Sequence, residues 1–200
     1  MFRDVSQEKS FCEKMMLGKM LNKEIQLRNG FACVLRQAEE QDADDILEYM
    51  NYVCGETDYL SYGRGDIHWT VENERKFIKD HLDSDNKLLI IAEVRGSING
   101  LIGFKGDEKK RMRHTGEFGV IVSQKYWGLG LGSALIECMI EWAKGSGIVR
   151  KINLMVRVDN QRALRLYKRF GFIEEGLVSR QFKMANKFYD AYFLGLHIDP

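Results

Sequence analysis

Residues 120–133 read Val-Ile-Val-Ser-Gln-Lys-Tyr-Trp-Gly-Leu-Gly-Leu-Gly-Ser. An apolar run typical of a strand leads here into three alternating glycines, Gly128, Gly130 and Gly132, and an amphipathic segment begins at about Leu131. Glycines leave main-chain N–H groups uncovered by Cβ atoms, and the first turn of a helix adds unpaired donors and the positive end of its dipole. The stretch therefore predicts a site for a ligand that carries a pyrophosphate.

Hydrophobic periodicity predicts the other elements. The dipeptide Asn29-Gly30 favours a hairpin turn, and the segment from Cys54 to Trp69 is expected to be a long loop. A helical connection between the strands at 115–123 and 151–158 makes that pair parallel, so we expect a mixed α/β sheet. The predicted strands are 24–28, 31–37, 87–94, 98–106, 115–123, 151–158, 172–183 and 187–196, and the predicted helices are 42–53, 70–82, 131–144 and 161–170.

Composition indicates one globular domain with a short N-terminal extension. The 200 residues are 44% hydrophobic and 30% charged, which suffices for one sizeable core. We place the extension at residues 1–22 and the domain at 23–200. Thirty basic and 29 acidic residues leave a formal charge of +1, so we expect neither nucleic acid nor a membrane as a partner.

The cysteines and the N-terminus indicate the compartment. Cys12, Cys33, Cys54 and Cys138 are far apart in sequence and have no histidine at ligand spacing, so we expect reduced thiols and no metal site. The first residues include charged side chains and no long apolar stretch. Together these features predict a cytoplasmic protein.

Three kinds of phosphate loop can be compared with the glycines. A Walker loop requires Gly-Lys-Ser/Thr, and Gly132-Ser133 has no lysine before the serine. A dinucleotide fingerprint requires Gly-x-Gly-x-x-Gly on the first strand-to-helix turn, which the spacing of these glycines does not satisfy. Asp159 does follow the next strand, as a ribose-binding acid would, so a nucleotide-dependent oxidoreductase stays as an alternative.

The third kind of loop accounts for a second motif as well. Residues 127–135, Trp-Gly-Leu-Gly-Leu-Gly-Ser-Ala-Leu, precede residues 160–172, Asn-Gln-Arg-Ala-Leu-Arg-Leu-Tyr-Lys-Arg-Phe-Gly-Phe. This pair resembles the acyl-coenzyme A loop and the later helix of the GNAT family of N-acetyltransferases. The resemblance extends over about residues 23–196 and implies the acyl-CoA N-acyltransferase fold, a twisted, mostly antiparallel sheet with a splayed parallel strand pair flanked by helices. Trp127 departs from the Gln or Arg that usually opens the family's loop.

The resemblance also implies a cofactor site for acetyl-CoA, which is the acyl donor, and no metal. The main-chain groups of Val120, Ile121 and Val122 would pair with the pantetheine. Gly128, Leu129, Gly130, Leu131, Gly132 and Ser133 would hold the pyrophosphate, and Asn160 would cap its helix or contact the cofactor.

Tyr167 is the predicted catalytic acid. It follows Ala163 by one helical turn, so both side chains lie on one face. The resemblance directs that face towards the cofactor sulfur, where a phenol can protonate the leaving thiolate. Glu117 is the leading candidate for the base, because it lies on the strand beside the implied cofactor site, about where several relatives hold a glutamate. Partial burial would raise its pKa usefully. His114 and His68 are further candidates, and proton loss to water would leave no essential base.

The acceptor is expected to be a small-molecule amine or an amine of a protein or peptide. We expect the loop 54–69 and the last hairpin to wall its pocket, since aromatic and acidic side chains suit a cationic amine. The predicted activity is direct attack of a primary amine on the thioester. A CoA-binding sensor without turnover is the alternative, and relatives suggest a homodimer through the final strands. The expected wall residues are Glu56, Asp58, Tyr59, Tyr62, Asp66, Trp69, Phe182, Tyr189 and Tyr192. The apolar surface for the homodimer would come from Phe188, Tyr189, Tyr192 and Phe193.

Overall fold

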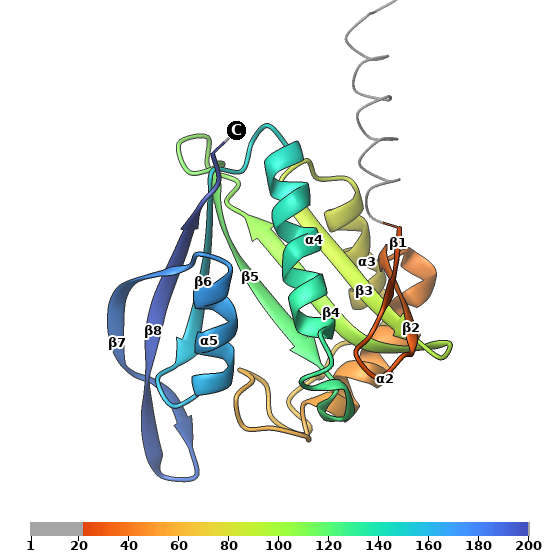
Figure 1. Cartoon of the computed structure of the whole chain (residues 1–200), viewed down its shortest axis with the longest axis horizontal. Coiled ribbons are helices and arrows are strands. Elements are labelled where there is room, and N and C mark those ends of the chain that lie inside the picture. The colour runs from red at the N-terminus through yellow and green to blue at the C-terminus, as the bar shows by residue number, and fades with distance from the viewer. Residues whose placement is uncertain (1–21, 200) are drawn as a thin grey trace, which may run out of the picture.

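The computed structural model describes residues 22–199 (Figure 1). The predicted extension, apart from its last residue, lies outside the described residues, as does Cys12. Every predicted strand and helix occurs, with ends that shift by a few residues. In chain order the main elements are β1 (Lys23–Gln26), β2 (Ala32–Gln37), α2 (Ala43–Val53), α3 (Val71–Leu82), β3 (Lys87–Val94), β4 (Ser97–Gly106), β5 (Thr115–Val122), α4 (Leu131–Gly145), β6 (Lys151–Arg157), α5 (Gln161–Arg169), β7 (Ile173–Met184) and β8 (Lys187–His197). Short 3₁₀ turns precede α2 and follow β5.

The strands form one eight-stranded sheet in the order β1-β2-β3-β4-β5-β6-β8-β7. All neighbours are antiparallel except β5 and β6, which are parallel, as the helical connection predicted. Their pairing covers only three residues of each strand and ends at Glu117 and Asn153. Beyond that pair the two strands separate, so a V-shaped opening divides the sheet.

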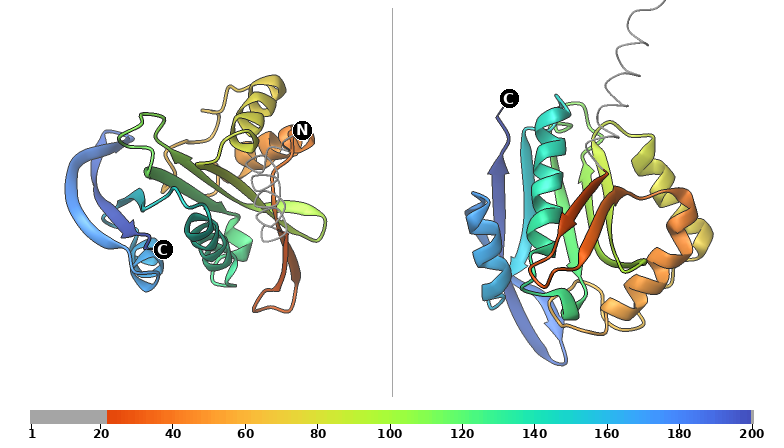
Figure 2. Two further views of the ribbon diagram at one scale, coloured as in Figure 1. Left: turned by 90° about the horizontal axis from the view of Figure 1, so that it is seen from above. Right: turned by 45° about the vertical axis from the view of Figure 1, so that its right-hand side comes forward.

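Helices cover both faces of the sheet (Figure 2). α4 and α5 lie on one face, where Leu135 and Met139 pack with Ile102 in the larger core cluster. α2 and α3 lie on the other face, where Ile46 and Ile78 pack with the strands in a second cluster. The opening between β5 and β6 is therefore reached from two sides with different surroundings.

The three described cysteines, Cys33, Cys54 and Cys138, are buried and free, as expected. Burial raises the pKa of the Cys138 thiol to about 11, so it stays protonated at neutral pH. A protonated thiol is a poor nucleophile, and this argues against an acyl-enzyme on Cys138. In residues 22–199, no helix has the length and apolar character that crossing a bilayer requires.

Candidate active site

A cavity of about 1120 Å³ lies where β5 and β6 separate. Side chains and main chain from β5, β6, α5 and the glycine loop line it on the α4/α5 face. Residues of α2, α3 and the loop 54–69 line it on the other face. The cavity thus passes through the sheet and brings most of the predicted site residues together.

The glycine loop forms the expected cradle at one end of this cavity. Gly128 and Gly130 have φ values of +81° and +100°, a left-handed conformation that L side chains rarely adopt. Gly130 precedes α4, and the first helical bond joins the Ala134 N–H to the Gly130 carbonyl at 3.0 Å. The N–H groups of residues 131–133 therefore form the open first turn of α4, as an anion site requires.

Three arginines that the sequence analysis did not single out surround this cradle. Arg28, in the β1–β2 turn, donates its main-chain N–H to the Leu129 carbonyl at 3.1 Å. Arg162 stacks on Trp127, with its guanidinium carbon 4.8 Å from the ring centroid. Arg169 donates to Ser133 Oγ at 2.6 Å. All three line the cavity, so they supply positive charge where phosphates would lie.

The register of β5 shows which of its main-chain groups face the opening. Ser123 N–H donates to the Asn99 carbonyl of the adjoining strand at 3.1 Å. Bonded pairs alternate along an antiparallel ladder, so the main-chain groups of Ile121 point to β4 and those of Val120 point to the opening. Val122 also faces the opening, but its carbonyl already accepts from the Trp127 indole N–H at 2.7 Å.

Two residues of the second motif take the expected positions. Asn160 caps α5, because its side-chain oxygen accepts the Ala163 N–H at 3.1 Å, and it also lines the cavity. Tyr167 is 9% exposed and lines the same cavity, with its ring edge-on to Phe118 at 5.9 Å. Burial raises the pKa of Tyr167 to about 12, so the phenol keeps its proton at neutral pH.

The acid that suggested a nucleotide site is already paired. Both oxygens of Asp159 accept from Arg157, at 2.9 and 2.6 Å. That contact holds the pKa of Asp159 below its ordinary value. The carboxylate thus fixes a neighbouring arginine, and this weakens the ribose-binding interpretation.

The fold places the three candidate bases in different surroundings. Glu117 lines the cavity from β5, on the α2/α3 face, but it is exposed, so the partial burial expected for it is absent. His114 and His68 are exposed and are not among the described residues that line the cavity. Only Glu117 of the three is therefore placed to meet a bound acceptor.

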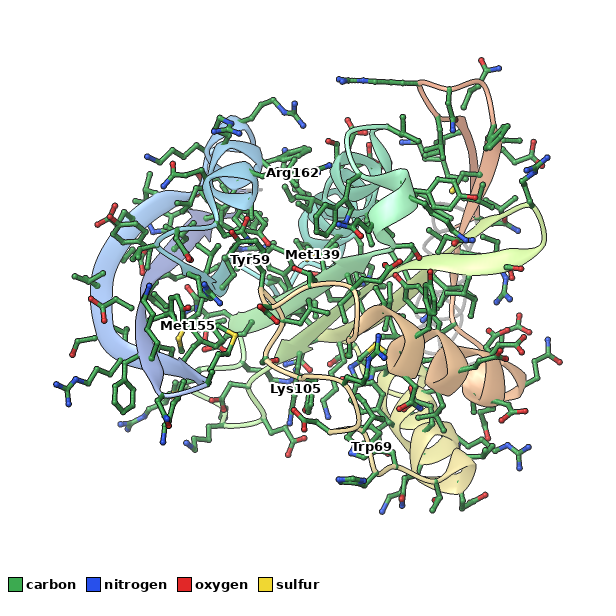
Figure 3. The ribbon with its side chains drawn as sticks, turned by 90° about the horizontal axis from the view of Figure 1, so that it is seen from below. Tyr59, Trp69, Lys105, Met139, Met155 and Arg162 are labelled. Carbon is green, nitrogen blue, oxygen red and sulfur yellow. The ribbon has the colours of Figure 1, made fainter. Side chains whose placement is uncertain are left out.

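The loop 54–69 bridges the open end of the V (Figure 3). Glu56 accepts the main-chain N–H of Gln124, just beyond β5, at 2.7 Å. The Asp58 carbonyl accepts from Arg157, the last residue of β6, at 2.9 Å. The loop is thereby tied to the far ends of both diverging strands.

Some side chains of this loop line the cavity, and others hold the loop in place. Tyr59, Tyr62 and Trp69 line the cavity, and so does Phe182 from β7. The acids Glu56, Asp58 and Asp66 are not among the described lining residues, and Asp66 instead accepts the Gly63 N–H at 2.7 Å. Tyr189 and Tyr192 are likewise outside the lining, so the predicted aromatic wall forms without its acids.

A buried acid that the sequence analysis overlooked faces the cavity from α3. Glu74 is 5% exposed and lines the cavity on the α2/α3 face. Burial raises its pKa to about 7. A sequence signal was present, since Glu74 lies three residues after Val71 and four before Ile78, on the apolar stripe of the helix.

Comparison with known proteins identifies the fold family. The model of the Acetyltransferase (GNAT) family matches residues 56–172. The acetyltransferase of GNAT family from Streptococcus pneumoniae has a crystal structure that superposes with a TM-score of 0.81 and 37% identity, over 84% of this chain and 99% of that one. The yncA structure from Salmonella typhimurium, with its cofactor acetyl-CoA, gives a TM-score of 0.73 at 21% identity, over 84% of this chain and 95% of that one.

Among curated proteins, the L-amino acid N-acetyltransferase AaaT of Escherichia coli (strain K12) is 30% identical over 105 residues. The match covers 52% of this chain and 65% of AaaT, just under two thirds of that relative. Family model, fold and glycine cradle agree, and the chain belongs to the GNAT family of acetyltransferases.

Proposed function

We propose that this protein transfers the acetyl group of acetyl-CoA to a primary amine by direct attack within a ternary complex. The glycine cradle with its surrounding arginines carries this proposal, because it suits the phosphates of coenzyme A. The residues Gly128, Leu129, Gly130, Leu131, Gly132 and Ser133 would hold the pyrophosphate. Val120 and Val122 would offer main-chain groups to the pantetheine, with the Ile121 side chain on the acceptor side, and Asn160 would fix the start of α5.

In the proposed reaction, the amine nitrogen forms a bond to the thioester carbonyl carbon, and the carbon–sulfur bond then breaks. Tyr167 gives its proton to the departing thiolate, which leaves as the free thiol of CoA. Glu117 takes the proton that the attacking amine must lose, directly or through water. The products are an N-acetylated amine and CoA, and no metal is required.

A thiol-release assay with acetyl-CoA and a panel of amines tests this function. We expect the release of the CoA thiol to depend on an amine and to be slower in Tyr167→Phe. Acetyl-CoA binding without release from any amine would instead support a sensor. A thermal shift with NAD but none with acetyl-CoA would support the oxidoreductase, because a ligand that binds the native state raises its melting temperature.

The proposal extends to partners and compartment. The acceptor would be a small-molecule amine or an amine of a protein or peptide. The exposed apolar side chains Ile173, Leu177 and Phe188 on β7 and β8 suit a homodimer through the final strands. Buried free thiols suit the reducing cytoplasm.

A further inference from the structure

Basic and acidic residues line different parts of the cavity, apart from Asp159, whose carboxylate is paired with Arg157. Arg28, Arg162 and Arg169 lie at the glycine loop, and Arg165 is on α5 beside them. Among the described lining residues on the α2/α3 face, the charges are acidic. They are Glu74 and Glu117.

Glu74 is placed as a ligand-binding carboxyl would be. Its side chain makes no hydrogen bond or ion pair with any residue of the described range 22–199, although it is 5% exposed. Burying a carboxylate without a partner costs free energy, and the cavity beside Glu74 is where a partner can enter. A partner for the Glu74 carboxylate would therefore come from a ligand in the cavity and not from the protein core.

The sheet leaves open space in the same cavity. Gly103 of β4 and Gly119 of β5 are register partners and both line the cavity. A Cβ atom at Gly119 would meet no atom within 4 Å, so the floor there is open. Trp69 and Phe77, whose ring centroids are 5.4 Å apart, line the same side. The pocket is thus apolar and aromatic, with an acid at each of two positions.

Lys105 of β4 is a positively charged residue on this face of the sheet. It is the register partner of Glu117 on β4, is exposed, and is not among the described lining residues (Figure 3). Lys105 therefore supplies no counter-charge for Glu74 inside the cavity.

We propose that Glu74 binds a second cationic nitrogen of the acceptor, so that the preferred acceptor is a diamine without a carboxylate. One nitrogen reacts beside Glu117 while the other pairs with Glu74 in the apolar pocket. The aromatic rings suit such a cation as well. An amino acid would place its own carboxylate among two acids and is disfavoured. This assignment rests on the proposed acetyl transfer.

Three matched series of acceptors test the assignment by thiol release. They are α,ω-diamines of three to six carbons, monoamines of the same lengths, and ω-amino acids of the same lengths. We expect the best diamine to exceed its monoamine by roughly tenfold or more in kcat/KM, as one desolvated ion pair provides. The ω-amino acids should be the poorest.

Glu74→Gln is the decisive variant, because it keeps the shape and removes the charge. It should reduce the diamine preference towards unity through KM, while kcat and the KM for acetyl-CoA stay nearly unchanged. Glu72→Gln is the matched control, since the Glu72 side chain is 83% exposed on the same helix, and it should retain the preference. Equal use of diamines and monoamines by the parent protein overturns the proposal even if Glu74→Gln fails to fold. An unchanged preference in a folded Glu74→Gln overturns it as well.

A binding measurement separates this inference from the proposed function. Diamine binding to the CoA complex, measured by calorimetry, should depend on Glu74 whether or not thiol is released. Glu74-dependent binding without release supports the inference and overturns acetyl transfer. Release from other amines, without a preference for diamines, overturns the inference alone. Neither binding nor release with any amine overturns both.

Discussion

The guanidinium carbon of Arg157 lies 3.8 Å from the ring centroid of Tyr189, and this pair joins the end of β6 to the last hairpin. Arg157 is 5% exposed and also binds Asp159 and the Asp58 carbonyl. One side chain therefore anchors the loop 54–69, β6 and β8 at the open end of the V. Its contacts make it a positioning residue for the wall of the acceptor pocket.

Replacing Arg157 by Met should release that loop. The change removes charge-assisted hydrogen bonds, and we expect a loss of about 2 kcal/mol in the free energy of unfolding, since the Asp159 partner can rehydrate. Faster tryptic cleavage at the exposed Arg64 should accompany it. Urea unfolding and limited proteolysis measure both effects. Tyr189→Phe keeps the ring and should change neither, and an unaltered cleavage rate in Arg157→Met would refute the anchoring role.

Tyr167→Phe should lower turnover by roughly 10²-fold, the lower range for a lost general acid, while acetyl-CoA affinity holds. Because the pKa of Tyr167 is raised to about 12, the phenol stays protonated across the ordinary assay range. Any fall in rate between about pH 8 and pH 10 must then come from another group. Steady-state kinetics over that range provide the measurement, and equal activity of the two proteins would remove Tyr167 as the acid.

Glu117→Gln tests whether Glu117 is the general base. If Glu117 accepts the amine proton, the acidic limb of the parent protein's pH–rate profile should move or vanish in the variant. Lys105→Met, which changes the register partner of Glu117 outside the cavity, serves as a control for altered local charge. A profile that keeps its acidic limb in Glu117→Gln would point to proton loss through water.

Gly132→Ala tests the role of the glycine cradle in CoA binding separately from its role in the stability of the fold. A Cβ at residue 132 would lie 3.7 Å from the nearest atoms of Leu166 and Val122, which is an ordinary contact. Alanine in a helix should raise stability by about 0.5–1 kcal/mol relative to glycine. Yet the methyl group would cover the first-turn amides, so CoA affinity should fall by roughly tenfold or more. Calorimetric titration with CoA measures this, and Gly176→Ala, with nothing within 4 Å of its added Cβ, is the control on β7.

Glu74 gives stability a definite pH dependence. Its pKa rises from 4.5 to about 7 on folding. A carboxyl with a raised folded pKa contributes stability that is complete below about pH 4.5 and is lost as pH rises through 7. Glu74→Gln should therefore be more stable than the parent above about pH 8, by up to roughly 3 kcal/mol, and should lose that advantage towards pH 4. Denaturant unfolding at several pH values measures the difference, and a pH-independent difference would contradict the burial argument.

Local patterns predicted the elements well because each carries its own signals. Asn29-Gly30 marked the first hairpin, and the glycine loop fixed the start of α4. The parallel pair followed from the connection through α4. How soon β5 and β6 separate could not be predicted, because the end of pairing at Glu117 and Asn153 depends on packing between distant segments.

The site was predictable only where its residues are neighbours in sequence. The glycines, Asn160 and Tyr167 belong to two short motifs and reach the cavity as expected. Arg28 comes from a turn about a hundred residues before the glycine loop, and only the folded sheet brings them together. Glu74 was missed for a different reason: an acid within an apolar helical stripe was overlooked, although its spacing indicated burial.

The early separation of β5 and β6 places an unpaired strand edge in the middle of the sheet, while β1 and β7 form its two rims. Unpaired edges commonly recruit strands of other chains and lead to aggregation. Here β6 flanks the edge and the loop 54–69 bridges its open end, so another protein's sheet cannot align with Val120. A single thin, extended molecule can align with Val120 there. The geometry that admits a ligand thus also protects the protein against self-association through its own interior.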